Sequence, residues 1–308
     1  MVRRPGMRVL VTGASGYLGS RLAAALHARG YDVVGVDREA PLVDEIDMRR
    51  MDLCDVDSLE GVLEGVDLVA HCASIHPWKP YTDADYIQCN VQGTWHLYEC
   101  ARRAGIDKVV LTSSIAAAGY SGIPPEEWPV PEETEHPLGE VYSFTKHAQE
   151  DAAKSFAAMH GVRTLALRPP AFMPSPGPVD TGSRLLGAYA LVEDMVSAHL
   201  AAVEVLGDGR EGPDAPEVFE AVNTTNALPY RPSDAALIGP GCDLLPLARR
   251  YWPFAADWLE QQGYQPGWLP IVYDLSKAKR LLGWEPRWSF PQWFEHRAQR
   301  DPVSGVPR

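Results

Sequence analysis

The chain has 308 residues, of which 45% are hydrophobic and 22% are charged. This composition provides enough apolar material for a folded core and excludes a disordered or collagen-like protein. The 28 basic residues are outnumbered by 41 acidic ones, which gives a net charge of −13. Because this surplus of negative charge opposes contacts with phosphate groups, we expect no nucleic-acid partner and no membrane partner.

The apolar runs stay well short of the roughly 20 residues that a membrane-spanning helix requires. The basic start of the chain is followed by only a short apolar stretch at 9–11, so no export signal is predicted. Five cysteines, an odd number without a CxxC pair, fit neither a disulfide framework nor a zinc site. We therefore expect a cytoplasmic protein that binds no metal.

Short runs of valine and leucine alternate with helical patterns through the first 170 residues. Strands are predicted at 8–12, 32–37, 68–71, 109–112 and 163–167, and helices at 16–29, 58–63, 84–104 and 142–160. Continuous apolar strands are typical of a sheet that is covered on both faces. The sequence therefore predicts an α/β fold with a doubly wound parallel sheet.

The composition changes after Pro170, where proline and glycine crowd a segment that is predicted to be a loop. A helix at 191–205 and a strand at 218–222 follow, and then irregular structure rich in proline and tryptophan. We expect a first domain over 1–170, to which 188–225 return. Residues 171–187 and 226–308 would form a small cap.

A GxxGxxG pattern, made by Gly13, Gly16 and Gly19, lies between the first predicted strand and the first predicted helix. Glycines in such a turn let the backbone approach a pyrophosphate at the helix N-terminus. Asp37 ends the second strand, where an acidic side chain accepts hydrogen bonds from ribose hydroxyls and repels a 2′-phosphate. The pattern predicts NAD and favours it over NADP, although Arg38 could receive such a phosphate.

Tyr142 and Lys146 are four residues apart at the start of a predicted helix, so both side chains share one face. A lysine ammonium beside a tyrosine stabilises the phenolate, which makes proton exchange with a substrate hydroxyl feasible near neutral pH. Ser113 and Ser114 follow the strand at 109–112, whose carboxyl end faces the expected ligand crevice. A serine hydroxyl from this pair would complete the catalytic set.

These motifs, in this order and spacing, resemble the extended short-chain dehydrogenase/reductase superfamily in its NAD-dependent epimerase/dehydratase group. Further matching stretches are 52–55, 69–73, the NVxGT pattern that begins at Asn90 and the SKAxxxLGWxP pattern at 276–286. The resemblance implies a Rossmann fold with a small C-terminal substrate-binding cap. It also implies a homodimer formed through the helices predicted at 84–104 and 142–160.

The resemblance assigns a role to each catalytic candidate. Tyr142 is the acid/base, Lys146 holds the ribose and lowers the pKa of the tyrosine, and Ser114 orients the substrate hydroxyl. The nicotinamide of NAD takes a hydride. The remaining cofactor contacts that the resemblance implies are Gly13, Ser15, Gly16, Tyr17, Leu18, Gly19, Asp37, Arg38, Asp52, Leu53, Cys72, Ala73, Ser74, Asn90, Thr112 and Pro169.

The chain departs from sugar-nucleotide enzymes where those enzymes bind a diphosphate, because the long middle insertion is missing and 265–268 lack the usual charged pair. The shortened segment resembles uronate dehydrogenases, in which an arginine at the position of Arg184 pairs with a sugar carboxylate. The asparagine and histidine of those enzymes are replaced here by Ile115 and Ala116. The expected substrate contacts are Ser74, His76, Trp78, Ser114, Ile115, Ala116, Tyr142 and Arg184.

The sequence thus predicts an NAD-dependent enzyme that oxidises a secondary hydroxyl of a sugar or nucleotide sugar, as an epimerase or dehydratase. A net dehydrogenase for a small acidic sugar is the alternative. A cofactor-sensing protein without activity is a third interpretation. Tryptophans near the C-terminus, Trp268 among them, are expected to pack in the core or the cap.

Overall fold

A computed structural model of the chain describes residues 6–40, 46–209 and 215–300. Seven parallel strands form one sheet in the order β3-β2-β1-β4-β5-β6-β7. These strands are β1 (Arg8–Thr12), β2 (Asp32–Asp37), β3 (Asp47–Arg50), β4 (Leu68–His71), β5 (Lys108–Thr112), β6 (Arg163–Arg168) and β7 (Phe219–Asn223). The strand order reverses between β1 and β4, where such sheets bind ligands outside their carboxyl ends. The predicted doubly wound parallel sheet is confirmed.

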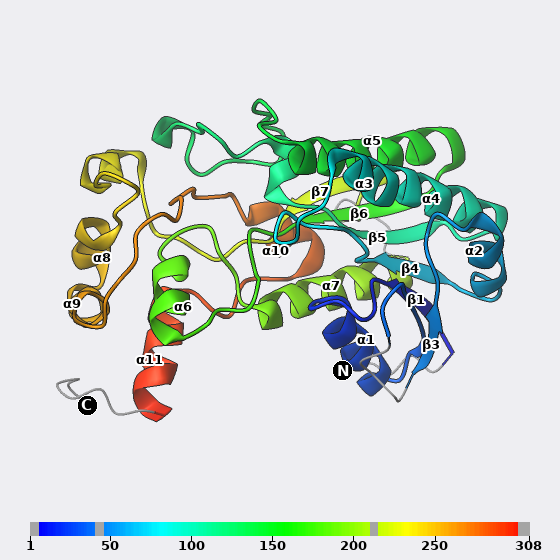
Figure 1. Cartoon of the computed structure of the whole chain (residues 1–308), viewed down its shortest axis with the longest axis horizontal. Coiled ribbons are helices and arrows are strands. Elements are labelled where there is room, and N and C mark those ends of the chain that lie inside the picture. Colours follow the sequence, from blue (N-terminus) through cyan, green and yellow to red (C-terminus); the bar gives the residue numbers. More distant parts are fainter. Residues whose placement is uncertain (1–5, 41–45, 210–214, 301–308) are drawn as a thin grey trace.

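Helices cover both faces of the sheet (Figure 1). On one face lie α1 (Gly19–Ala28), α7 (Val192–Asp208) and α10 (Ser276–Leu282), which share a hydrophobic cluster with the strands. On the other face lie α2 (Val56–Val62), α4 (Gly93–Arg103) and α5 (Val141–His160). No helix in the described part of the chain is long and apolar enough to cross a membrane.

The long helix predicted at 84–104 contains a π-helical segment. It consists of α3 (Asp83–Tyr86), the π-helix η1 (Ile87–Gln92) and then α4. The fully buried Asn90 lies in the π-helix, and its side-chain oxygen accepts a hydrogen bond of 2.8 Å from the backbone N–H of Ile75. Its amide nitrogen donates to the Ile75 carbonyl at 3.1 Å. Asn90 therefore holds the loop that follows β4.

The remaining helices form a second lobe, drawn at the left of Figure 1. This lobe contains α6 (Pro178–Leu185), α8 (Leu245–Tyr251), α9 (Pro253–Gln261) and α11 (Phe290–Arg300). The described ranges also contain the 3-10 segments η2 (Ile115–Ala118), η3 (Pro125–Glu127) and η4 (Pro232–Leu237), of which η4 packs against α8. Side chains of the lobe, including Leu247, Leu259 and Phe290, bury a hydrophobic cluster separate from those of the sheet.

The structure differs from the expected elements in two ways. Helices α6, α8, α9 and α11 lie in segments that were expected to be loop or irregular structure, and one further strand joins the sheet. The edge strand β3 was not predicted, because its polar residues Asp47, Arg49 and Arg50 are exposed and give no apolar run. Helix α10 falls in the segment assigned to the cap, yet Ala278 and Leu281 pack in the cluster that α1 and α7 share with the sheet. Helix α10 thus packs with the sheet layer, and the assignment of 171–187 and 226–308 to a cap stays a prediction.

Candidate active site

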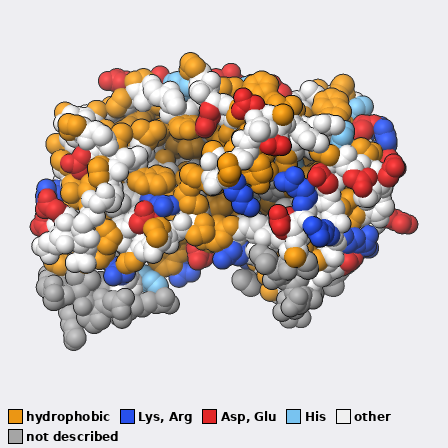
Figure 2. All heavy atoms as spheres, in the orientation of Figure 1, with side chains coloured by type: hydrophobic (Ala, Val, Ile, Leu, Met, Phe, Trp, Pro, Cys, Tyr) orange, Lys and Arg blue, Asp and Glu red, His pale blue; other side chains and the backbone are white. Residues whose placement is uncertain are grey.

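A cavity of about 630 Å³ opens at the carboxyl ends of the strands and is lined from both the sheet and the second lobe. Figure 2 shows the face hollowed between the two halves of the molecule, with hydrophobic side chains gathered there. The volume lies within the range of small-molecule sites. Every predicted cofactor or substrate residue lines this cavity except Asn90, Lys146 and Arg184.

The glycine turn after β1 leaves no room for side chains. Gly13 has a φ of +67°, and a Cβ there would lie 2.7 Å from the backbone nitrogen of Ala73. A Cβ on Gly19 would lie 2.1 Å from the Gly13 carbonyl oxygen. Helix α1 begins at Gly19 without a side-chain cap, and the Ser20 N–H donates to the Gly16 carbonyl at 3.1 Å, so the turn and the helix start form one continuous unit. This cradle fits the pyrophosphate of a dinucleotide.

Asp37 connects the end of β2 to the glycine turn. Its carboxylate accepts a hydrogen bond of 2.9 Å from the backbone N–H of Ser15 and another of 2.9 Å from Glu39. Arg38 lies 3.8 Å from Asp52, so its guanidinium is partly committed to a carboxylate. The Asp37 carboxylate lies on the cavity wall, and the charge of the neighbouring Arg38 is partly neutralised by Asp52. This arrangement favours the unphosphorylated ribose of NAD over the 2′-phosphate of NADP.

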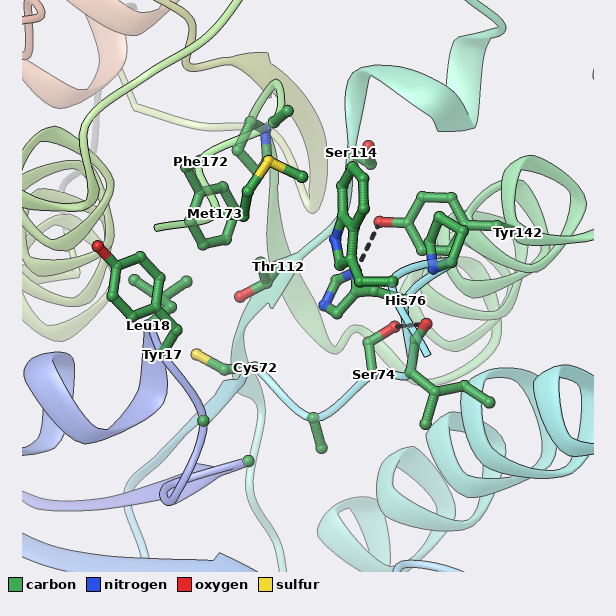
Figure 3. Close-up of a pocket in the computed structure, with 18 of the residues that line it drawn as sticks. Tyr17, Leu18, Cys72, Ser74, His76, Thr112, Ser114, Tyr142, Phe172 and Met173 are labelled. Carbon is green, nitrogen blue, oxygen red and sulfur yellow. Dashed lines mark hydrogen bonds between the residues drawn. The ribbon is translucent and has the colours of Figure 1, made fainter. Parts of the chain in front are cut away.

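Tyr142 and Ser114 meet at the other end of the cavity (Figure 3). Burial raises the pKa of Tyr142 above its ordinary value of 10, whereas a hydrogen bond with Ser114 lowers it. Ser113, the other member of the serine pair, donates its hydroxyl to Glu150 at 2.5 Å. Ser114 is therefore the serine whose hydroxyl is placed beside the phenol.

Lys146 lies beneath the site and is fully buried. Its Nζ donates a hydrogen bond of 2.9 Å to the Thr112 carbonyl at the end of β5 and lies 5.8 Å from the centre of the Tyr142 ring. Burial lowers the pKa of Lys146 to about 7. Burial is the largest influence on the pKa of Tyr142 and raises it, so the lowering of this pKa by the lysine stays a prediction.

A histidine forms an unexpected contact with the candidate acid/base. The Nδ1 of His76 lies 3.2 Å from the hydroxyl of Tyr142, and Figure 3 draws this hydrogen bond. Burial lowers the pKa of His76 to about 3. At neutral pH the imidazole is therefore neutral, and its tautomer sets which of the two groups donates the hydrogen bond. The sequence placed His76 near the substrate but did not predict this bond.

A layer of buried polar side chains supports the site from below. His71 bridges two threonines, with 2.7 Å between its Nδ1 and Thr12 and 2.9 Å between its Nε2 and Thr94. Arg168 forms two hydrogen bonds to the Glu150 carboxylate, at 2.9 and 2.7 Å, and both side chains are buried. In the described ranges, no group of three or more His, Cys, Asp or Glu side chains could hold a metal ion.

Arg184, the expected partner of a sugar carboxylate, lies outside the cavity wall. Its Nε is 2.5 Å from an oxygen of Asp180, and the side chain is only 12% exposed. The guanidinium also lies 5.1 Å from the ring centre of Trp268 and 5.4 Å from that of Tyr189. Trp268 itself lines the cavity, so Arg184 stands behind a wall residue that was expected only to pack.

Several lining residues were not identified from the sequence. They come from segments that follow β6 or lie in the second lobe, where no motif marks them, and they include Phe172, Met173, Leu269 and Ile271. Their common signal is hydrophobicity inside a segment rich in proline, which is equally typical of ordinary packing. Only the folded chain brings these distant segments to the same cavity.

Comparison with known proteins places the chain in a family. Residues 9–214 match the model of the NAD dependent epimerase/dehydratase family. A uronate dehydrogenase of Pseudomonas syringae pv. tomato is 27% identical over 194 residues, which cover 62% of this chain and 67% of that protein. Sterol demethylase protein B of Methylococcus capsulatus is 35% identical over 192 residues, covering 60% of this chain and 56% of that protein.

The fold of the chain also matches that of a protein of known structure. A crystal structure of a UDP-galactose 4-epimerase superimposes with a TM-score of 0.67 at 25% identity, covering 96% of this chain and all of that one. The glycine cradle, the acidic residue at the end of β2 and the tyrosine and lysine on α5 thus accompany a match that spans most of the sheet. The chain belongs to the NAD dependent epimerase/dehydratase family, and its cofactor is NAD.

Proposed function

We propose that this protein oxidises a secondary alcohol with NAD and that Tyr142 is the side chain that exchanges the hydroxyl proton. The observation that carries the proposal is the position of the Tyr142 phenol beside Ser114, in a cavity that also contains the glycine cradle. The names of the three relatives refer to a uronate, a sterol and a UDP-sugar. Because these substrates differ, the relatives support redox chemistry at an alcohol more strongly than any one substrate.

Bound NAD supplies the acceptor for the hydride that leaves the carbinol carbon. The Ser114 hydroxyl is placed to hydrogen-bond the substrate oxygen, and Tyr142 is placed to take the proton from that oxygen. Before it can do so, the phenol must release its own proton, and the Nδ1 of His76 lies 3.2 Å from the phenol oxygen. Lys146, held on the Thr112 carbonyl, keeps a titratable amine beneath the tyrosine ring.

The test is the Tyr142→Phe variant, which retains the ring and removes the hydroxyl. We expect NADH formation at 340 nm to fall by about 100-fold or more with any alcohol that the wild type oxidises, because general acid–base catalysis contributes this much. NAD affinity should stay close to that of the wild type. Tyr251→Phe, which changes a tyrosine of α8 outside the cavity, should retain activity. Unchanged turnover of Tyr142→Phe would remove the tyrosine from the mechanism.

The overall reaction has two candidate outcomes. An epimerase or dehydratase returns the hydride and keeps its cofactor reduced only transiently, whereas a net dehydrogenase releases NADH. Accumulation of free NADH in proportion to substrate supports the dehydrogenase, and product formation without it supports the epimerase or dehydratase. The sugar or nucleotide-sugar substrate, the homodimer and the cytoplasmic location stay predictions.

A further inference from the structure

The substrate end of the cavity is built mainly from hydrocarbon. Phe172, Met173 and Ile271 line it from the segment after β6 and from the second lobe, together with Trp268 and Ile115. Figure 3 shows Phe172 and Met173 on the side of the cavity across from Tyr142. An apolar wall contributes most to binding when the ligand itself has a large apolar surface that binding removes from water.

The charges on the wall do not suit an anionic substrate. Within the described part of the chain, the lining residues include four carboxylates and two cations, Arg38 and Lys79. Arg38 is paired with Asp52 at the Asp37 end of the cavity. Lys79 is an exposed side chain, and one solvated ammonium binds a diphosphate far more weakly than buried, paired donors do. A second diphosphate, belonging to the substrate and lying outside the glycine cradle, would therefore lack charge partners on this wall.

A sugar carboxylate would also lack its expected partner. Arg184 does not line the cavity, its Nε lies 2.5 Å from Asp180, and its guanidinium contacts the rings of Tyr189 and Trp268. The carboxylate on the wall near Tyr120, that of Glu140, would repel the ligand instead of binding it, and the Tyr120 hydroxyl already donates to it at 3.1 Å. Burying a charge without a partner is strongly unfavourable.

We infer that the natural substrate is an uncharged, largely apolar secondary alcohol, and not a sugar that carries a diphosphate or a carboxylate. The inference rests on the proposed oxidation of an alcohol. Such a ligand needs polar partners only at its reacting oxygen, where Ser114 and Tyr142 lie. The rest of the molecule would contact Phe172, Met173 and the aromatic wall.

Four probes that each contain a secondary hydroxyl test this inference: trans-2-decalol, glucose, glucuronate and UDP-glucose. With NAD and wild-type enzyme, we expect kcat/KM for decalol to exceed that for each of the other three at least tenfold. An equal or higher value for glucuronate, UDP-glucose or glucose would overturn the apolar assignment while leaving the proposed oxidation intact.

Binding to the NAD-loaded Tyr142→Phe enzyme separates the two proposals, because it does not depend on turnover. We expect decalol to raise the melting temperature more than the three polar probes do at equal concentration. If decalol binds in this way but the wild type never oxidises it, the proposed chemistry fails and the substrate class stands. If decalol does not stabilise the enzyme, or UDP-glucose or glucuronate does so more strongly, the substrate class is refuted.

A matched pair of substitutions locates the binding surface. Met173→Lys puts a charge into the apolar wall and should weaken decalol binding at least tenfold. Val218→Lys puts the same charge at a side chain that is 44% exposed, outside the cavity and outside the helices predicted to form the dimer, and it should leave binding unchanged. Equal effects of the two substitutions would contradict the inference.

Discussion

Substitution of Gly19 by alanine should disrupt the cradle that holds the cofactor. The new Cβ would lie 2.1 Å from the Gly13 carbonyl oxygen, so the two must separate by about 1.3 Å to reach the 3.4 Å of an ordinary contact. Both groups belong to the backbone of a tight turn, so no flexible side chain can absorb the shift. Overpacking of this kind costs about 1–3 kcal/mol.

If the turn relieves this strain by opening, binding must close it again. The same 1–3 kcal/mol then reappears as NAD affinity that is about 5- to 150-fold weaker. Isothermal titration with NAD measures the change directly, and thermal unfolding without NAD shows any loss of stability. Gly61→Ala is the control, because a Cβ at this position in α2 meets nothing within 4 Å. Wild-type NAD affinity of the Gly19→Ala protein would refute the claim that this glycine turn holds the cofactor.

Three further predictions concern charges around the site. Asp37→Ala should weaken NAD more than NADP, because the carboxylate favours the unphosphorylated ribose; equal losses in titrations with the two cofactors would argue against this role. Glu150→Ala should lower the free energy of unfolding by about 3–5 kcal/mol in denaturant titrations, since it leaves the buried charge of Arg168 unpaired; a change below about 1 kcal/mol would show that the site relaxes. Burial lowers the pKa of His71 to about 3, so between that pH and 6.5 the unfolded chain binds more protons and stability falls as the pH falls. His71→Gln should therefore lose less stability than the wild type between pH 7 and 5.5, and parallel losses would contradict a neutral His71.

The sheet could be predicted because strands that are buried on both faces are continuous runs of apolar residues, which are visible in the sequence. Strands β1 and β5 are continuous apolar runs, and their cores are almost fully buried. Strand β3 has no such run, since an exposed edge strand needs only backbone pairing with β2. The π-helical segment at Ile87–Gln92 could not be predicted either. One extra residue in a helical turn changes the spacing of apolar residues too little to be recognised in the sequence.

The cofactor half of the site was predictable for a related reason. The glycine turn and the acidic residue at the end of β2 depend on backbone geometry and on short spacings along the chain. Such features can be recognised from a local sequence pattern. The positions of Arg184 and His76 depend on contacts across the fold. Asp180 precedes Arg184 by four residues, so helical spacing alone could have indicated that ion pair. No local pattern reveals that Trp268 contacts the same guanidinium, or that His76 meets a tyrosine 66 residues away.

The separate hydrophobic cluster of the second lobe has a consequence for how such a protein changes over evolution. Leu247, Leu259 and Phe290 pack with one another and not between the strands of the sheet. Mutations can therefore accumulate in this lobe and reshape the pocket while the parts that hold the coenzyme stay intact. The lobe is assembled from separate segments of the chain, so changing substrate selectivity by transplantation requires exchanging all of these segments between relatives.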